Sequence, residues 1–228
     1  EHRLTGGKFL AYEPATHLPL LIRGPGIKPG TATGELAGNI DITPTILELA
    51  GVTPDKSIDG TSLVPFFRDP ELRTRRPILF ESFVETNDVE ANGEATAQRS
   101  RVKELRRRRP TAGAHASIIA PPKDYEGIRL GPYKYIEWPD GEKELYDITK
   151  DPYELNNIVR ESNYFPIRAY LHAELVRLET CVGHTCRESA PPFPLTQKEQ
   201  RRVDKQRREE ERRKQKEREE KRHHKRRG

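Results

Sequence analysis

The chain has 228 residues, of which 33% are hydrophobic and 34% are charged, and its formal net charge is +5. So large a charged share is unusual for a fully globular chain and predicts a solvated tail. Residues 197–228 carry 16 Lys or Arg and 8 Asp or Glu, a net charge of +8, which leaves −3 on the remaining 196 residues. The body of the chain is therefore not marked as a nucleic-acid binder, and no apolar run approaches the ~20 residues of a membrane-spanning helix.

The first half of the chain shows an α/β pattern. The apolar run 18–23, stopped by Gly24-Pro25-Gly26, is typical of a short strand buried on both faces. A helix is expected to run to residue 50 from a cap at Asp41 or Thr43, with Pro44 in its first turn and Gly51 after its end. The residues expected on its buried face are Ile42, Ile46, Leu47, Leu49 and Ala50. A turn at Asp59-Gly60, a short segment 62–67 and a second apolar strand over 78–83 complete the stretch.

The second half predicts a small antiparallel sheet with one helix. Apolar periodicity is lost over 85–122, which we interpret as an exposed insertion. A strand is then expected over 128–138, a turn over 139–141 and the antiparallel partner strand over 144–148. Pro166 should open a helix. The residues expected on its buried face are Ile167, Leu171, Leu175 and Leu178.

The end of the chain has too few apolar residues to form a core. Beyond Pro194 only Leu195 and Val203 are apolar, so the tail is either disordered or a solitary helix held by charged pairs at spacings of three and four. A coiled coil would need an apolar seam, which the tail lacks.

Cys181 and Cys186 are the only cysteines, and Gly183 between them would help to close a short loop. A disulfide is the favoured interpretation and would indicate an oxidising compartment. Two free thiols are the second alternative. A metal site that includes His184 is the third, although two Cys and one His leave tetrahedral coordination incomplete.

Several blocks of sequence, taken in order, resemble the sulfatase family of the alkaline-phosphatase-like superfamily. The resemblance covers about residues 1–90 and 125–188 and leaves the insertion and the tail unmatched. Each block alone is weak, but their shared order is specific. The blocks are Glu1-His2-Arg3-Leu4, Gly7-Lys8, Tyr12-Glu13, 15–22, Gly24-Pro25-Gly26, 40–52, Asp59-Gly60-Thr61-Ser62-Leu63, Gly131-Pro132-Tyr133-Lys134-Tyr135, Glu144-Leu145-Tyr146-Asp147 and 151–157.

The resemblance implies a truncated α/β, alkaline-phosphatase-like sulfatase fold that ends in a small antiparallel sheet with a helix and a charged tail. It divides the chain into four parts. These are the last portion of the catalytic domain (1–90), a flexible basic insertion (91–124), a small subdomain (125–190) and a charged low-complexity tail (191–228).

The same resemblance implies hydrolysis of sulfate esters with a calcium ion and a formylglycine nucleophile made from Cys or Ser. No Cys-x-Pro-Ser-x-Arg type motif occurs in this sequence. The nucleophile and the calcium ligands are therefore expected upstream of residue 1, and this fragment alone is expected to be inactive.

Two residues are candidates for chemistry. Lys8 occupies the place of the family lysine that reaches the sulfate group, where an ammonium stabilises negative charge in the transition state. His2 lies beside the site in the family pattern, either as a general acid or, as we favour, as a supporting group. Tyr133, Tyr135 and Trp138 could border a substrate cleft, but aromatic residues that alternate along a strand are more often packing residues.

The expected substrate is a sulfated small molecule or glycan, and the expected location is secreted, periplasmic or extracellular. One alternative is a phosphate or phosphonate monoester hydrolase of the same superfamily. Another is a non-catalytic module that binds anionic polymers through residues 99–109 and the tail. Neither segment interleaves aromatic residues with its basic ones, so nucleic-acid binding is disfavoured and non-specific polyanion contact is retained.

Overall fold

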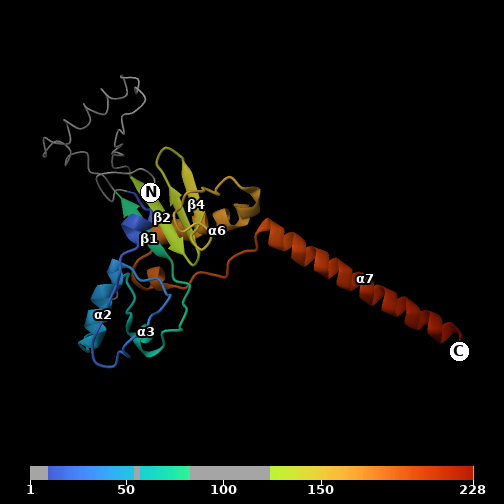
Figure 1. Ribbon diagram of the computed structural model, residues 1–228, viewed down its shortest axis with the longest axis horizontal. Coiled ribbons are helices and arrows are strands. Elements are labelled where there is room, and N and C mark those ends of the chain that lie inside the picture. Colours follow the sequence, from blue (N-terminus) through green and yellow to red (C-terminus); the bar gives the residue numbers. More distant parts are fainter. Residues whose placement is uncertain (1–9, 54–56, 83–123, 228) are drawn as a thin grey trace, which may run out of the picture.

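The computed structural model describes residues 10–53, 57–82 and 124–227, with side chains described as far as residue 215 (Figure 1). The candidate residues His2 and Lys8 and nearly all of the insertion 91–124 lie outside these ranges, so the predictions for them stay predictions. Among the residues that the structure describes, no helix combines the length and the apolar composition needed to cross a bilayer.

The centre of the molecule is a four-stranded antiparallel sheet with strand order β1-β2-β3-β4. Its strands are β1 (Ile78–Ser82), β2 (Tyr125–Leu130), β3 (Tyr133–Glu137) and β4 (Lys143–Asp147). The prediction of one strand over 128–138 is wrong, because Gly131 and Pro132 form a two-residue turn that pairs Leu130 with Tyr133. Gly131 takes a φ of 51°, a conformation that glycine adopts without strain.

β1 joins two parts of the chain that are far apart in sequence. It pairs along its whole length with β2, so a strand from the segment 1–90 lies in the sheet of the segment 125–190. The division at residue 90 thus separates two neighbouring strands, and it remains a proposal about the complete domain.

α6 (Phe165–Glu179) covers one face of the sheet, as Figure 1 shows, and begins with Pro166 in its first turn. The four residues predicted for its inner face are all buried, which confirms the helix and its orientation. They pack against apolar residues of three strands, namely Ile128, Leu130, Tyr133, Tyr135 and Leu145. Full burial of one such side chain contributes roughly 1.5–3 kcal/mol, so this contact dominates the stability of the sheet.

The opposite face of the sheet is covered by the start of the described chain. Ala11 packs there with Tyr125, Ile136 and Trp138. Because side chains alternate along a strand, Lys134 also points to this face, away from α6. The strand β3 is therefore enclosed on both sides.

In its described residues, 10–53 and 57–77, the segment before β1 contains short helices and no strand. They are α1 (Glu13–Thr16), η1 (Asn39–Asp41), α2 (Ile42–Leu49) and α3 (Val64–Arg68). The predicted strand over 18–23 is wrong: the run has no regular structure, and Leu21 is 94% exposed. A strand needs a hydrogen-bonded neighbour, and no described strand lies beside these residues.

The helix expected to run to residue 50 is confirmed, but its predicted buried face is wrong. α2 buries Pro44 and Thr45 instead, and the Thr45 hydroxyl accepts a hydrogen bond from the backbone N–H of Leu63 at 2.8 Å. Ile42, Ile46, Leu49 and Ala50 are exposed and Leu47 is only half-buried. The apolar pattern therefore marks a face that the described chain leaves uncovered.

Asp41 organises this segment from a fully buried position. Its carboxylate accepts hydrogen bonds from the backbone N–H groups of Gly38 and Thr61, both at 2.8 Å, and pairs with the Arg76 guanidinium. Gly60, in the predicted turn, lies so close to the Ile40 carbonyl that a Cβ there would be 1.9 Å from its oxygen. A side chain at residue 60 would therefore push the two segments apart.

The end of the chain is helical. After the short turns η2 (Ser162–Tyr164) and η3 (Gly183–Arg187), α7 (Gln197–Arg227) extends away from the body as a solitary helix (Figure 1). The structure thus takes the helical one of the two alternatives for the tail, and the expectation of a disordered tail is not supported. Pairs such as Lys214–Glu210 at 2.6 Å supply the contacts that an apolar seam would otherwise give.

Candidate functional site

A buried ionic cluster lies directly after the segment that carries Lys8. Its centre is Lys134, whose Nζ atom is 2.7 Å from Glu13 Oε1 and 2.9 Å from Glu154 Oε1. The same ammonium group donates to the Thr16 hydroxyl at 3.2 Å and lies 5.7 Å from the centre of the Phe80 ring. The side chains of Lys134 and Glu154 are fully shielded from solvent.

Three separate parts of the chain meet in this cluster. Glu13 opens α1, and its backbone N–H donates to Glu154 Oε2 at 2.5 Å. Glu154 takes a positive φ of 55° in the loop after β4, and Lys134 comes from the middle of β3. Arg129, from β2, places its Nε atom 3.8 Å from Glu13 Oε1. The cluster therefore ties the beginning of the described chain to the sheet.

The charges of the cluster balance. Two cations, Lys134 and Arg129, face two carboxylates, Glu13 and Glu154. Burial raises the pKa of the Glu154 carboxyl above its ordinary value, and the hydrogen bonds and the charge of Lys134 oppose that rise. Burial likewise lowers the pKa of Arg129, against the attraction of the carboxylates of Glu13, Glu154 and Asp147, which favours the charged form. Each charge is thus compensated by its neighbours, which is what buried ions require.

This arrangement positions the chain rather than performing chemistry. Lys134 and Glu154 have no solvent contact, and their polar atoms are engaged with one another. What the cluster can do is hold α1 against the sheet. His17 adds a contact at the surface of the cluster, where its Nδ1 atom lies 3.4 Å from Glu13 Oε2.

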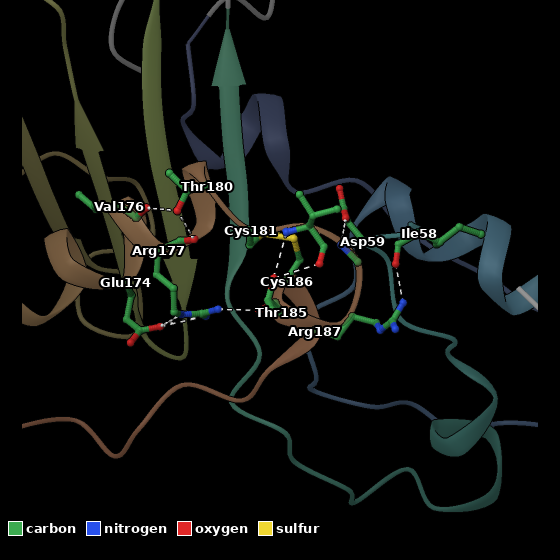
Figure 2. Close-up of a disulfide and its surroundings, with 12 residues drawn as sticks. Ile58, Asp59, Glu174, Val176, Arg177, Thr180, Cys181, Thr185, Cys186 and Arg187 are labelled. Atoms are coloured by element: carbon green, nitrogen blue, oxygen red, sulfur yellow. Dashed lines mark hydrogen bonds and ion pairs between the residues drawn. A yellow bond between two sulfur atoms is a disulfide. The ribbon is translucent and has the colours of Figure 1, made fainter. Parts of the chain in front are cut away.

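A second tie joins the carboxy-terminal loop to the segment before β1 (Figure 2). Cys181 and Cys186 form the expected disulfide, with Cα atoms 5.1 Å apart. Inside the loop, the Gly183 N–H donates to Asp59 Oδ1 at 2.6 Å, and the Arg187 guanidinium donates to the Ile58 carbonyl. The bonded pair removes free thiols and a Cys-ligated metal from the alternatives, because disulfide sulfur does not offer a thiolate.

Comparison with known proteins identifies the family of this chain. The family described as N-sulphoglucosamine sulphohydrolase, C-terminal, matches residues 1–103. The N-acetylglucosamine-6-sulfatase of Capra hircus is 32% identical over 180 residues, covering 77% of this chain and 32% of that protein. An arylsulfatase of Chlamydomonas reinhardtii is 31% identical and covers 81% of this chain and 28% of its own length.

The chain belongs to the sulfatase family. It spans about a third of the length of the curated sulfatases that it matches. Among solved structures, a phosphonate monoester hydrolase of Silicibacter pomeroyi is 25% identical with a TM-score of 0.54, covering 78% of this chain and 32% of that one. The predicted alkaline-phosphatase-like fold class, with its small antiparallel sheet plus helix, is thereby confirmed.

The aromatic residues of β3 are packing residues of this sulfatase fold. Tyr135 is fully buried, Tyr133 and Trp138 are nearly so, and no substrate cleft is formed by them. The described residues also contain no group of three or more His, Cys, Asp or Glu side chains placed to hold a metal ion. The described residues therefore do not fit the calcium site that the sulfatase resemblance implies.

The buried ionic cluster is not predicted from the sequence. Lys134 belongs to one of the family blocks and stands between two tyrosines on a strand. Because side chains alternate along a strand, a lysine between two buried tyrosines is expected to face solvent, and only Ile136 and Trp138 on the same face signal that this face is covered. That Glu13 and Glu154 would supply carboxylates to Lys134 could not be seen, since they lie 121 residues before it and 20 residues after it.

Proposed function

We propose that the complete protein hydrolyses sulfate esters and that this chain supplies the carboxy-terminal part of its catalytic domain. The observation that supports this most strongly is the 32% identity to an N-acetylglucosamine-6-sulfatase over 77% of the chain. Sulfated sugars or other sulfated small molecules are the proposed substrates. The nucleophile, proposed to be formylglycine, and the ligands of a calcium ion would then be supplied by sequence upstream of Glu1.

Lys8 is the proposed contribution of this chain to the reaction. Its ammonium group would face the sulfate and stabilise the negative charge that develops on the leaving oxygen. His2 would support it from the side. The described structure is consistent with this role, because the ionic cluster of Glu13, Lys134 and Glu154 anchors the chain five residues after Lys8.

The uncovered apolar residues between 18 and 52 support the proposal of a larger catalytic domain. Leu18, Leu20, Leu21, Ile22, Ile40, Ile42, Ile46, Leu49 and Val52 are each at least 38% exposed, and we call them the amino-terminal apolar surface. Contiguous apolar surface of this kind marks a missing contact. We propose that the upstream part of the sulfatase domain covers these side chains.

A location outside the cytosol is proposed with the function. The Cys181–Cys186 disulfide supports a secreted, periplasmic or extracellular protein, since reducing compartments keep such thiols free.

The decisive experiment compares the 228-residue chain with the protein translated from the full gene, using 4-nitrophenyl sulfate and glucosamine 6-sulfate with calcium present. The chain alone should be inactive and the full protein active. Lys8→Ala in the full protein should lower kcat by roughly 100-fold or more, as loss of one transition-state contact does. Sulfatase-like turnover by the chain alone, or an unchanged kcat in Lys8→Ala, would refute the assignment.

Hydrolysis of phosphate or phosphonate monoesters is the second candidate. It is favoured by the likeness to the phosphonate monoester hydrolase of Silicibacter pomeroyi. The same full protein assayed on phenyl phosphonate and phenyl sulfate decides between the two. A higher kcat/KM for the phosphonate than for the sulfate would favour phosphonate monoester hydrolysis as the function.

A further inference from the structure

α7 carries a basic stripe that the proposed catalytic function does not use. Lys198, Arg201, Lys205, Arg208 and Arg212 follow one another at alternating spacings of three and four. At 100° per residue these five positions fall within about 80° of arc and extend over roughly 21 Å of helix. Between residues 197 and 215 no acidic residue falls within that arc. We call these five residues the α7 basic stripe.

The charges of the stripe are available. Among the described side chains, Arg201, Arg208 and Arg212 have no carboxylate within 4 Å, and only Lys205 has one, Glu209 at 3.8 Å. The other faces of the helix are more evenly balanced. There Arg207 pairs with Glu211, and Lys214 pairs with Glu210.

The stripe borders two open hollows that follow one another along the helix. The first, of about 470 Å³, lies between η2 and α7 and is lined by Asn163, Lys198, Arg201 and Lys205 among others. The second, of about 450 Å³, is lined by Arg201, Lys205, Arg208 and Arg212 together with Asp204 and Glu209. Arg201 and Lys205 border both hollows, so a chain-like ligand could pass from one to the other.

The beginning of α7 is fixed to the body of the molecule. Thr196 and Glu199 form a reciprocal cap: Glu199 Oε2 accepts from the Thr196 N–H at 2.9 Å, and the Glu199 N–H donates to the Thr196 hydroxyl at 3.3 Å. The Lys198 N–H also donates to Asn163 Oδ1 at 2.8 Å. The stripe is therefore presented in one orientation rather than on a loose tail.

We propose that the α7 basic stripe binds a sulfated polysaccharide, as a surface separate from the catalytic site. A periodic row of guanidinium and ammonium groups matches a polymer with sulfate groups along its length. The stripe has no aromatic residue on which a nucleobase could stack, which disfavours single-stranded nucleic acid. The choice of a sulfated polymer rests on the proposed sulfatase function and on the non-cytosolic location that the disulfide supports.

Binding of heparin by the purified 228-residue chain tests this, measured by titration at 50 to 300 mM NaCl. The test variant is Arg201→Gln, Lys205→Gln, Arg208→Gln. The matched control is Arg207→Gln, Arg213→Gln, Lys214→Gln, which removes the same charge from positions outside the stripe. Glutamine keeps helix propensity, and circular dichroism verifies that α7 persists in both.

The stripe variant should bind at least 10-fold more weakly at 150 mM NaCl, and its log K against log [NaCl] slope should be shallower by about 2 to 3, because fewer counterions are released. The control should lose less than about 3-fold. If both variants lose the same heparin affinity, binding depends on total charge and not on the stripe, and the proposal is overturned. Tighter binding of a DNA or RNA oligomer than of heparin at equal charge concentration would also overturn it.

The outcome is separate from that of the catalytic proposal. Heparin binding is read without turnover, so an inactive protein can still support the stripe. An active sulfatase with an unaffected stripe variant would refute only the binding surface.

Discussion

The sheet unit (β1 to β4 with α6) and the segment 10–53 contain similar apolar patterns with opposite fates. In the sheet unit, Leu171 and Ile128 are fully buried because helix and sheet cover one another. In the segment 10–53, Leu21 and Ile46 are 94% and 59% exposed, although each lies in an equally apolar run. An apolar pattern thus predicts which residues need a partner, and the fold decides whether the partner is present.

The buried cluster of Lys134 with Glu13 and Glu154 joins these unlike regions, together with the packing of Ala11 against the sheet. The disulfide loop, bonded to residues 58 and 59, holds the stretch that follows the segment 10–53. Substitutions in each of these places therefore test the difference between the two regions.

The largest effect is expected from Lys134→Ala. The substitution leaves Glu154 without its ion-pair partner and Glu13 with Arg129 alone, and loss of one partner from a buried ionic group costs about 3–5 kcal/mol. Urea unfolding of the purified chain measures it. The control is Lys143→Ala on β4, whose pair with Glu137 is partly exposed and should be worth less than about 1 kcal/mol.

A companion variant separates charge from packing at the same place. Lys134→Met combined with Glu13→Gln and Glu154→Gln removes all three charges and should recover part of the lost stability. If Lys134→Ala costs no more than Lys143→Ala, the cluster does not join the two regions.

The next effect tests the two apolar patterns directly. Leu171→Ala should destabilise the chain by about 2–5 kcal/mol, because it leaves a cavity between α6 and the sheet. Ile46→Ala in α2 should change the free energy of unfolding by no more than about 0.5 kcal/mol, since its side chain is already exposed. Thermal unfolding of both variants gives the comparison.

The protein from the full gene sharpens this prediction. If the amino-terminal apolar surface is covered there, Ile46→Ala should become destabilising by at least about 1 kcal/mol in that protein. An unchanged cost would show that α2 stays exposed in the longer chain.

A smaller effect is expected from Cys186→Ser with Cys181→Ser. The loop is short, so its closure contributes only about 2 kcal/mol in the chain-entropy account. The loosening should be local, since Gly183 and Arg187 hold residues 58 and 59 through this loop. Hydrogen exchange should rise at these four residues and not in β2 or β3; uniform protection changes would contradict a local role.

The smallest effect is a change in acid sensitivity within the sheet unit. Burial alone would raise the pKa of Glu137, but hydrogen bonds donated by Tyr135, Lys143 and His172 outweigh it and hold the pKa below its ordinary value of 4.5. The group therefore stabilises the fold above pH 4.5, and this contribution is lost as the pH falls through the lowered pKa.

Glu137→Gln should therefore flatten the loss of stability below pH 4.5, measured by urea unfolding at pH 7 and between pH 5 and 3. Glu142→Gln, in the neighbouring exposed turn, is the control and should leave the acid limb unchanged. If Glu137→Gln loses stability between pH 5 and 3 as steeply as the unchanged chain, other carboxylates are responsible for the acid sensitivity.

Local sequence was sufficient for the elements that depend on near neighbours. Pro166 and the spacing of Ile167, Leu171, Leu175 and Leu178 predicted α6 and its inner face, because helix periodicity is a local property. The Cys181–Cys186 disulfide was also predictable from local sequence, because these are the only two cysteines and they lie five positions apart. The turn at Gly131 and Pro132 was equally local, and the longer apolar run concealed it.

Only the tertiary structure decided the contacts between distant segments. Nothing near residues 18–23 indicates whether a neighbouring strand exists, because backbone pairing is made by another part of the chain. The same holds for β1, which pairs with β2 across the 42 residues from 83 to 124. It holds most clearly for Lys134, whose charge is tolerable in the core only because Glu13, 121 residues before it, and Glu154, 20 residues after it, both reach it.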